Sequence, residues 1–329
     1  MTHFRFSLAV CLVQAVFFTG VSVAAATEIR TAVSFGADWT LGSVEYDLKS
    51  ESGGNGVQSR LDFPVDGLYP AITVTVGGYE NGRPAWSLAA TATGNILGPY
   101  GAMVDQDWNL VAGYPPVLYS YTESSSSLRE LRGRLTYTSY PFHPLPADIG
   151  LRFGYEFESL YQRMDGVTGW QYQYNNGTSS YDRVTFSITG TVGTYQLYLH
   201  TLIAGLAYRF ELHPQLSFTL TGDGLVILAF DDDDHILRTK RSTASAAGGG
   251  YRVAADLRFA PGADRSSRGF SVNLAGSIEG FSLFGLQTQT WYGNADASNG
   301  APQGTVYTGI YHHISGFRCR VALYGEYAF

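Results

Sequence analysis

The strongest constraint on this fold is a strict alternation of side chains over residues 317–329, the last segment of the chain. One side of an extended strand there carries Arg318, Arg320 and Glu326. The opposite side is apolar or glycine throughout: Phe317, Cys319, Val321, Leu323, Gly325, Tyr327 and Phe329. Successive side chains of a strand point to opposite faces, so this segment suits a wall between lipid and a wet lumen. The pattern predicts a strand of a transmembrane β-barrel.

The same alternation recurs in segments 131–138, 151–158 and 251–259, where arginines again oppose apolar residues. Short breakers interrupt the pattern at residues 81–84, 142–148, 211–215 and 261–268. Longer polar loops are expected at about 48–57, 97–127, 163–182, 231–250 and 286–314. Four short turns alternating with five long loops give ten strands, and such alternation is typical of outer-membrane barrels.

We therefore predict an all-β fold, a ten-stranded antiparallel transmembrane β-barrel with short periplasmic turns and long extracellular loops. The alternative is a soluble β-sandwich. A sandwich has no need for arginines opposite an apolar face in strand after strand, so the barrel is favoured.

Composition excludes several other classes. The 329 residues include 21 Lys and Arg against 28 Asp and Glu, a formal charge of −7, and only 15% are charged. So few charges argue against disorder, and an acidic balance argues against a nucleic-acid partner. With two cysteines, the chain offers neither a disulfide framework nor a cysteine-rich zinc site.

The first 26 residues have the pattern of a secretory signal peptide. Arg5 precedes an apolar stretch over 8–23, and the small residues Ala24 and Ala26 follow. We predict cleavage after Ala26, which leaves residues 27–329 as a single barrel domain. The alternative is a membrane anchor, but the apolar run is shorter than the ~20 residues that span a bilayer.

Two clusters of chemically capable residues lie in the predicted loops. One is Met-Val-Asp-Gln-Asp-Trp at 103–108, and the other is four aspartates and a histidine at 231–235. Extending the alternation of residues 216–230 puts Asp231, Asp233 and His235 on the lumen side. An aspartate two residues from a histidine can fix its tautomer and stabilise its charged form.

Asp105 and Asp107 have the same spacing, and crowded carboxylates raise one another's pKa. Two alternatives stay open for these clusters. The aspartate run could be a solvated loop, or the clusters could bind a divalent cation. His312 and His313 fall in the last predicted loop and are expected to be an interfacial loop feature rather than a ligand pair.

Both clusters, in this order on a ten-stranded scaffold, resemble the omptin family of outer-membrane endopeptidases. The family motif M-V-D-Q-D-W is matched letter for letter at 103–108, and its N-D-E-H stretch is matched by residues 232–235. Looser similarity covers residues 59–63 and 202–210. The similarity therefore extends over most of the chain beyond the signal peptide.

The resemblance implies a mechanism without a metal or a covalent intermediate. Asp233 would orient His235, and His235 would act as general base on a water shared with Asp105. Asp107 would complete the acidic couple. Omptins cut at basic residues, and the resemblance implies that Glu45 and Asp231 bind the basic side chain before the scissile bond.

The resemblance also implies a place in the cell and a lipid activator. The site would face the exterior of a bacterial outer membrane, and the protein is expected to be a monomer acting on exposed polypeptides. Omptins need lipopolysaccharide, bound by a Tyr, Glu and Arg on a lipid-facing strand. Tyr155 matches the tyrosine, but Phe157 and Ser159 stand where the other two belong.

Two functions of other classes compete with the protease. A non-catalytic barrel could serve as an adhesin or receptor whose acidic loops hold a partner. A small pore is the second rival. The protease alone requires the two aspartate clusters to face one cleft.

Overall fold

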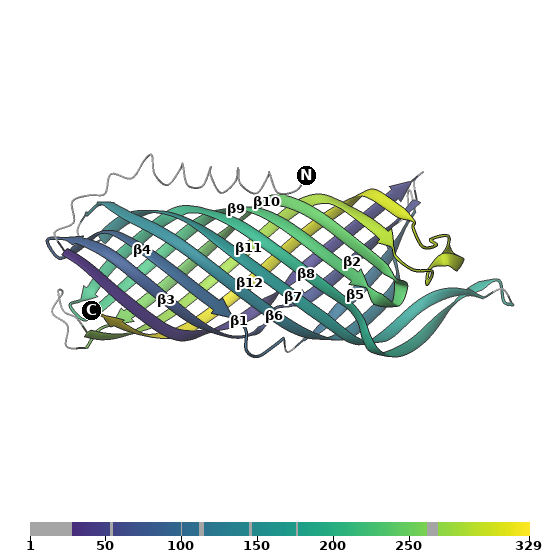
Figure 1. Cartoon of the computed structure of the whole chain (residues 1–329), viewed down its shortest axis with the longest axis horizontal. Helices are drawn as coiled ribbons and strands as arrows, with labels where there is room; N and C mark the ends of the chain where they lie inside the picture. Colours follow the sequence, from purple (N-terminus) through teal and green to yellow (C-terminus); the bar gives the residue numbers. More distant parts are fainter. Residues whose placement is uncertain are drawn as a thin grey trace.

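The alternating segments form antiparallel strands that curl into a barrel in a computed structural model (Figure 1). The structure describes residues 28–52, 55–99, 101–111, 115–144, 147–175, 177–261 and 269–329. The signal-peptide prediction for residues 1–26 and the breaker after Pro261 lie outside this part of the chain. No helix among the described residues is long and apolar enough to cross a membrane.

Twelve strands of one sheet are named along the described residues. They are β1 (Glu28–Ser52), β2 (Asn55–Pro64), β3 (Gly67–Glu80), β4 (Arg83–Gly94), β5 (Ala102–Val111), β6 (Val117–Phe142), β7 (Ala147–Asn175), β8 (Ser180–His213), β9 (Leu216–His235), β10 (Lys240–Phe259), β11 (Gly269–Trp291) and β12 (Val306–Ala328). Two short 3₁₀ helices, η1 (Ile236–Arg238) and η2 (Ala297–Asn299), follow β9 and β11.

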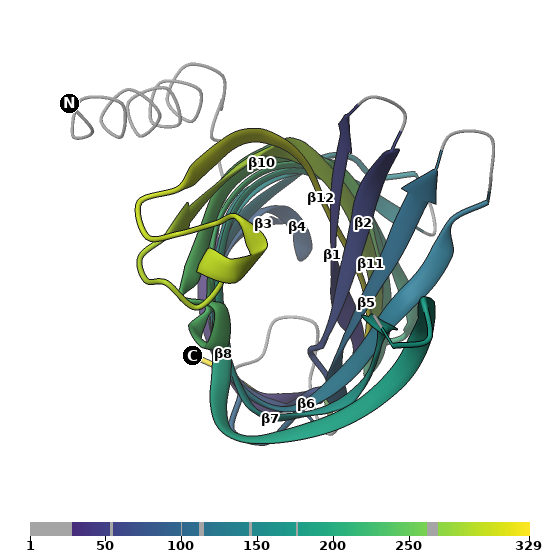
Figure 2. The ribbon, with the colours of Figure 1, turned by 90° about the vertical axis from the view of Figure 1, so that its right-hand side faces the viewer.

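These strands make a ring of ten at each level of the barrel. We call the half of the barrel with the short turns the lower half, and the half with the long hairpins the upper half. In the lower half β3 and β4 lie between β1 and β6, whereas in the upper half β2 and β5 occupy these positions. β12 closes the ring by pairing with β1 from Ala32↔Ala328 to Lys49↔Tyr311. The predicted ten-stranded barrel is confirmed. Figure 2 shows the closed ring from the end with the long hairpins.

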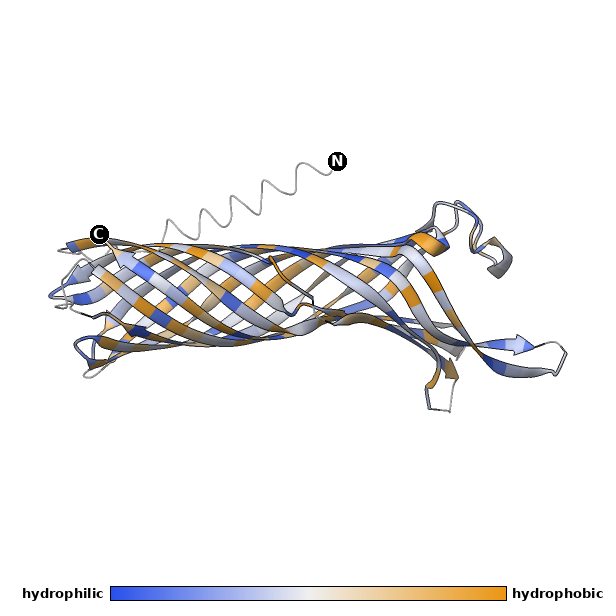
Figure 3. Cartoon of the chain, turned by 90° about the horizontal axis from the view of Figure 1, so that it is seen from below, coloured by the Kyte–Doolittle hydropathy of each residue, from blue (hydrophilic) through white to orange (hydrophobic). Residues whose placement is uncertain are grey.

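Side-chain alternation is as predicted over the lower part of the barrel, where hydrophobic and hydrophilic residues alternate along the strands (Figure 3). Outward residues such as Leu131, Val226 and Val321 are about 60% exposed. Their inward neighbours Arg132 and Arg320 are buried. An apolar outer face around a polar interior is the arrangement of a membrane-spanning barrel.

The turns at one end of the barrel are short, and the hairpins at the other end are long. Asn81 and Gly82 have φ values of 53° and 75°, the conformation that a tight β3–β4 hairpin requires. At the far end, β7 and β8 extend past the barrel rim (Figure 1). Much of what we predicted as loop is strand: β5 and the first residues of β6 fall within 97–127.

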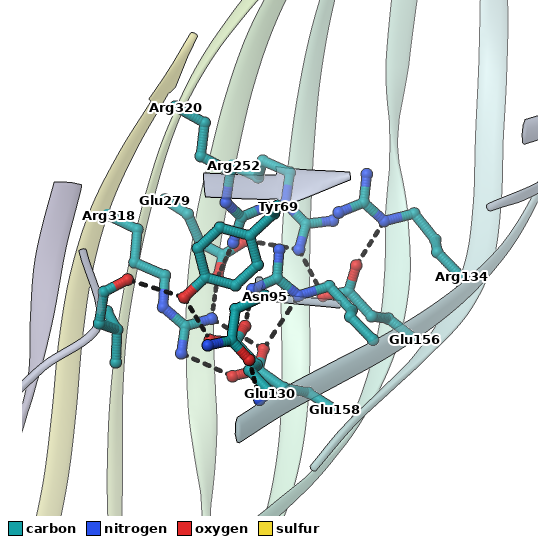
Figure 4. A network of polar contacts seen from close by, with 12 residues as sticks. Tyr69, Asn95, Glu130, Arg134, Glu156, Glu158, Arg252, Glu279, Arg318 and Arg320 are labelled. Atoms are coloured by element: carbon teal, nitrogen blue, oxygen red, sulfur yellow. Dashed lines mark hydrogen bonds and ion pairs between the residues drawn. The ribbon is translucent and has the colours of Figure 1, made fainter. Parts of the chain in front are cut away.

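The lumen at mid-height is filled by a network of buried charges (Figure 4). Arg318 makes a two-pronged ion pair with Glu158 at 2.6 and 2.7 Å, and Arg132 also donates to Glu158 at 3.2 Å. Arg252 joins the carboxylates of Glu156 and Glu279 at 2.7 and 2.6 Å. Side chains from several strands therefore cross-link the barrel and obstruct its interior.

Candidate active site

The β9–β10 hairpin carries one half of the site. Asp231, Asp233 and His235 alternate with outward residues on β9, and the first two are buried inside. Asp232 points outward and forms a two-pronged ion pair with Arg241 on β10. The lumen orientation that we predicted for Asp231, Asp233 and His235 is the one found.

This half of the site lies above the membrane-spanning part of the wall. Along β9 toward the end with the long hairpins, the outward residues change from the apolar Leu228 and Phe230 to the charged Asp232 and Asp234. A lipid-facing band does not tolerate such charges, so the band ends below Asp232. Asp233, His235 and their neighbours therefore sit in the water-exposed rim.

Strand β5 carries the other half. In the β2–β5 pairing, Asp105 stands opposite Leu61 and Asp107 stands opposite Ser59. Cross-strand partners share a face, and Leu61 is buried within the barrel, so both aspartates point inward. The Ser59 hydroxyl lies 3.4 Å from Asp105 Oδ1 and also interacts with Asp107.

The two halves influence each other electrostatically across the rim. Burial, together with the negative charges of Asp107 and Asp233, raises the pKa of Asp105 to about 8. Burial also raises the pKa of Asp107, while Ser59, Arg238, Lys240 and His235 oppose that rise. The structure thus brings Asp105, Asp107, Asp233 and His235 into one site, where the raised pKa values favour a shared proton on the aspartate couple.

Asp233 and His235 form a close pair. His235 Nε2 lies 2.7 Å from Asp233 Oδ2, and His235 is 23% exposed while Asp233 is 2% exposed. The contact is an ion pair rather than a hydrogen bond, since no hydrogen-bond partner of Asp233 Oδ2 occurs among the described residues. Water can reach the imidazole, whereas the carboxylate is shielded behind it.

Lys240 is a site residue that the sequence analysis missed. It pairs with His235 at the start of β10 and is 5% exposed. Burial and the nearby Arg238 lower its pKa, while the charges of Asp233, Asp105 and Asp107 oppose that effect. A lysine five residues after a histidine carries no recognisable signal, and only the turn at 236–239 brings it back to the site.

The two residues expected to bind a basic side chain are not brought together. Glu45 pairs with Asp62 and Ser315, on the face opposite to its buried neighbour Tyr46, so it points outward. Its carboxylate lies 3.5 Å from Arg60 on that outer face. Asp231 points inward instead, and its side chain is fully buried.

His312 occupies the space beside Asp231. The expectation that His312 lies in an interfacial loop is wrong, because β12 begins at Val306 and turns this side chain into the barrel. Its Nε2 lies 2.7 Å from Asp231 Oδ2. The polar run 286–314 hid this strand, since an extramembrane strand has no apolar outer face to reveal it.

Tyr155, the residue expected to bind lipid, lies on the outer face of β7. Its hydroxyl is 2.7 Å from His200 Nδ1 on β8, and Phe157 and Phe230 also contact the His200 ring. No group of three or more His, Cys, Asp or Glu placed to hold a metal ion occurs within the described ranges.

Asp105 makes stability depend on pH in a defined direction. Its raised pKa means that the folded chain binds a proton more tightly than the unfolded chain, so stability falls as pH rises from about 4 to about 8. We expect Asp105→Asn to equal wild type near pH 4 and to be more stable near pH 8 by a few kcal/mol, at ~1.4 kcal/mol per pKa unit. Thermal unfolding in detergent at both pH values measures this, and a constant difference would contradict it.

Comparison with known proteins identifies the architecture. No family model matches the chain, and no curated protein sequence matches it. Among solved structures, the outer membrane protease OmpT from Escherichia coli matches with a TM-score of 0.69 over 94% of this chain and 99% of that one. The fold is that of OmpT. Sequence identity to OmpT is 14%, so the match confirms the omptin-like barrel as a fold.

Two further matched barrels have much lower TM-scores. The match to the Pseudomonas putida toluene transporter TodX covers 91% of this chain and 90% of the TodX chain, with 10% identity and a TM-score of 0.26. The match to the CymD monoaromatic hydrocarbon channel covers 91% of this chain and 88% of the CymD chain, with 9% identity and a TM-score of 0.24. We draw nothing from either of these two matches.

Proposed function

We propose that this protein is an outer-membrane endopeptidase that uses an Asp–His pair and an aspartate couple to activate water. The observation that carries the proposal is the shared site of Asp233, His235, Asp105 and Asp107 at the barrel rim. Residue types, spacing and mutual electrostatics all suit proton transfer to and from a bound water. The OmpT-like fold adds support, since OmpT is an outer membrane protease.

In the proposed mechanism a water lies between His235 and the aspartate couple. His235 takes a proton from this water as the oxygen attacks the scissile carbonyl, and Asp233 stabilises the imidazolium that forms. The couple of Asp105 and Asp107 holds the water through its shared proton and its free oxygens. His235 then gives its proton to the leaving amine, so the peptide is cut without a covalent intermediate.

The proposed location is the bacterial outer membrane, with the site facing outward. In such barrels the short turns are periplasmic and the long hairpins extracellular, and the site is at the hairpin end. Substrates would be exposed polypeptides. The acidic rim attracts cationic chains, so we propose substrates that carry basic residues, cut by a monomeric enzyme.

The rival functions receive less support. A pore needs an open lumen, whereas the charges around Glu158, Arg318 and Arg252 block this one. The adhesin function does not require a partly exposed imidazole paired with a buried carboxylate and set opposite a second acidic pair. Buried, crowded acids destabilise a fold, and such costs are typical of catalytic sites.

The test is hydrolysis of an unfolded protein by the refolded barrel, followed by mass spectrometry of the fragments. Parallel samples with and without lipopolysaccharide test whether that lipid activates this chain, as we propose from the position of Tyr155. New peptide termini that accumulate with enzyme concentration support the proposal. A folded barrel that leaves the unfolded substrate protein intact, with and without lipopolysaccharide, would overturn the proposed function.

A further inference from the structure

A second Asp–His pair lies directly beneath the proposed catalytic pair. Asp231 is two residues before Asp233 on the same inner face of β9, so in the proposed mechanism it would lie next to the substrate side chain that flanks the scissile bond. His312 Nε2 lies 2.7 Å from its Oδ2, and neither side chain has any exposed surface. An open acidic pocket for a cationic side chain would need this carboxylate to be accessible.

Aromatic residues hold His312 in place. The Tyr46 ring lies 4.4 Å from the His312 ring and 5.6 Å from the Tyr195 ring, each at a steep angle. Phe63 stacks on the other side of Tyr195 at 4.4 Å, and Gln287 donates a hydrogen bond to the Tyr46 hydroxyl. All of these side chains are buried. An entering side chain would have to displace this packed cluster to reach Asp231 Oδ2.

The pair satisfies only part of its hydrogen-bonding capacity. Among the described residues, no hydrogen-bond partner occurs for three buried atoms: Asp231 Oδ1, His312 Nδ1 and the Tyr195 hydroxyl. These atoms offer single hydrogen bonds to a neutral polar group. They do not offer a free carboxylate to a guanidinium, which favours a two-pronged contact with both oxygens.

We propose that His312 is a built-in occupant of the Asp231 subsite, so that the enzyme prefers an uncharged side chain there and disfavours arginine and lysine. The inference rests on the proposed function and narrows its substrates. Basic residues that the acidic rim attracts would then lie farther from the scissile bond. A buried arginine or lysine could not contact both oxygens of this already partnered carboxylate, so its charge would lack full compensation, and this makes the preference strong.

Removing the imidazole is expected to reverse the preference. His312→Ala leaves a space beside Asp231 and frees the carboxylate. With matched fluorogenic peptides that differ only next to the scissile bond, the Arg-to-Leu ratio of kcat/KM should rise about tenfold or more. Adding Asp231→Asn should abolish the rise. His313→Ala is the control, because His313 points to the other face and contacts Ser282 at 2.9 Å.

A binding measurement keeps the test independent of catalysis. Calorimetric titration with N-acetyl-argininamide should give no binding to wild type, binding to His312→Ala, and none to the double variant. If no peptide is cut but this order holds, the subsite assignment stands and the proposed function fails.

The wild type supplies a test even if the variants do not fold. A wild type that cuts the arginine peptide with a higher kcat/KM than the matched leucine peptide would overturn the inference. An Arg-to-Leu ratio and a binding affinity that His312→Ala leaves unchanged would also overturn it.

Discussion

Replacing His235 with alanine is expected to lower kcat/KM for peptide hydrolysis by about 10²- to 10⁴-fold, the range for loss of a general base. The side chain is partly exposed and its close partner is Asp233, so the barrel should fold normally. Asp233→Asn keeps the shape but removes the charge that stabilises the imidazolium, and a smaller loss is expected. Initial rates with a fluorogenic peptide, with circular dichroism to verify folding, measure both effects.

Asp232→Asn is the matched control for these variants. Asp232 lies between Asp231 and Asp233 on β9 but points outward to Arg241, so the control removes one carboxylate from the same segment without touching the site. Its rate should be close to that of wild type. Equal losses in Asp232→Asn and His235→Ala would mean that general surface charge, not proton transfer, carries the activity.

The second large effect concerns stability. Glu158→Gln should lower the free energy of unfolding by about 3–5 kcal/mol, because loss of one partner leaves buried cations uncompensated. Glu158 is bound by Arg318 through both oxygens and by Arg132, and all three side chains are buried. The shift in the denaturant midpoint of the barrel in micelles measures the loss.

An exposed pair on the same strand provides the comparison. Arg163 and Asp165 form an ion pair at 2.9 Å with about half of each side chain exposed, and Arg163→Gln should cost no more than about 1 kcal/mol. If Glu158→Gln cost as little as Arg163→Gln, the lumen network would not be what holds the wall strands together.

The alternation of residues predicted the membrane-spanning half of the barrel well. In β12, Phe317, Val321 and Leu323 face outward and Arg318 and Arg320 face inward, as the pattern required. Lipid on one side and a charged lumen on the other impose opposite chemistry on successive residues, so each strand there can be recognised from its own sequence.

The rim was harder to predict because water lies on both sides of its strands. The upper part of β7 carries the exposed Arg163 and Asp165, where an apolar outer face would otherwise mark a strand, so the sequence resembled a loop. Parity still oriented Asp233 and His235, since β9 continues without a break from its apolar half. Contacts between distant strands, such as Asp231 with His312 and Lys240 near Asp105, depend on how the barrel closes and leave no local pattern.

Glu45 shows the limit of transferring a role by approximate spacing. A shift of one position along a strand moves a side chain to the opposite face. The buried residue at this height of β1 is Tyr46, and Glu45 contacts Arg60 outside the barrel.

The most direct test of the central claim is a double-mutant cycle between Asp105→Asn and His235→Ala, measured as kcat/KM for one peptide. If Asp105 and His235 hold a single water, either substitution disables the site, and the double variant should be little slower than the slower single variant. Losses that multiply would show that the two clusters act independently and would contradict a single water-activating site.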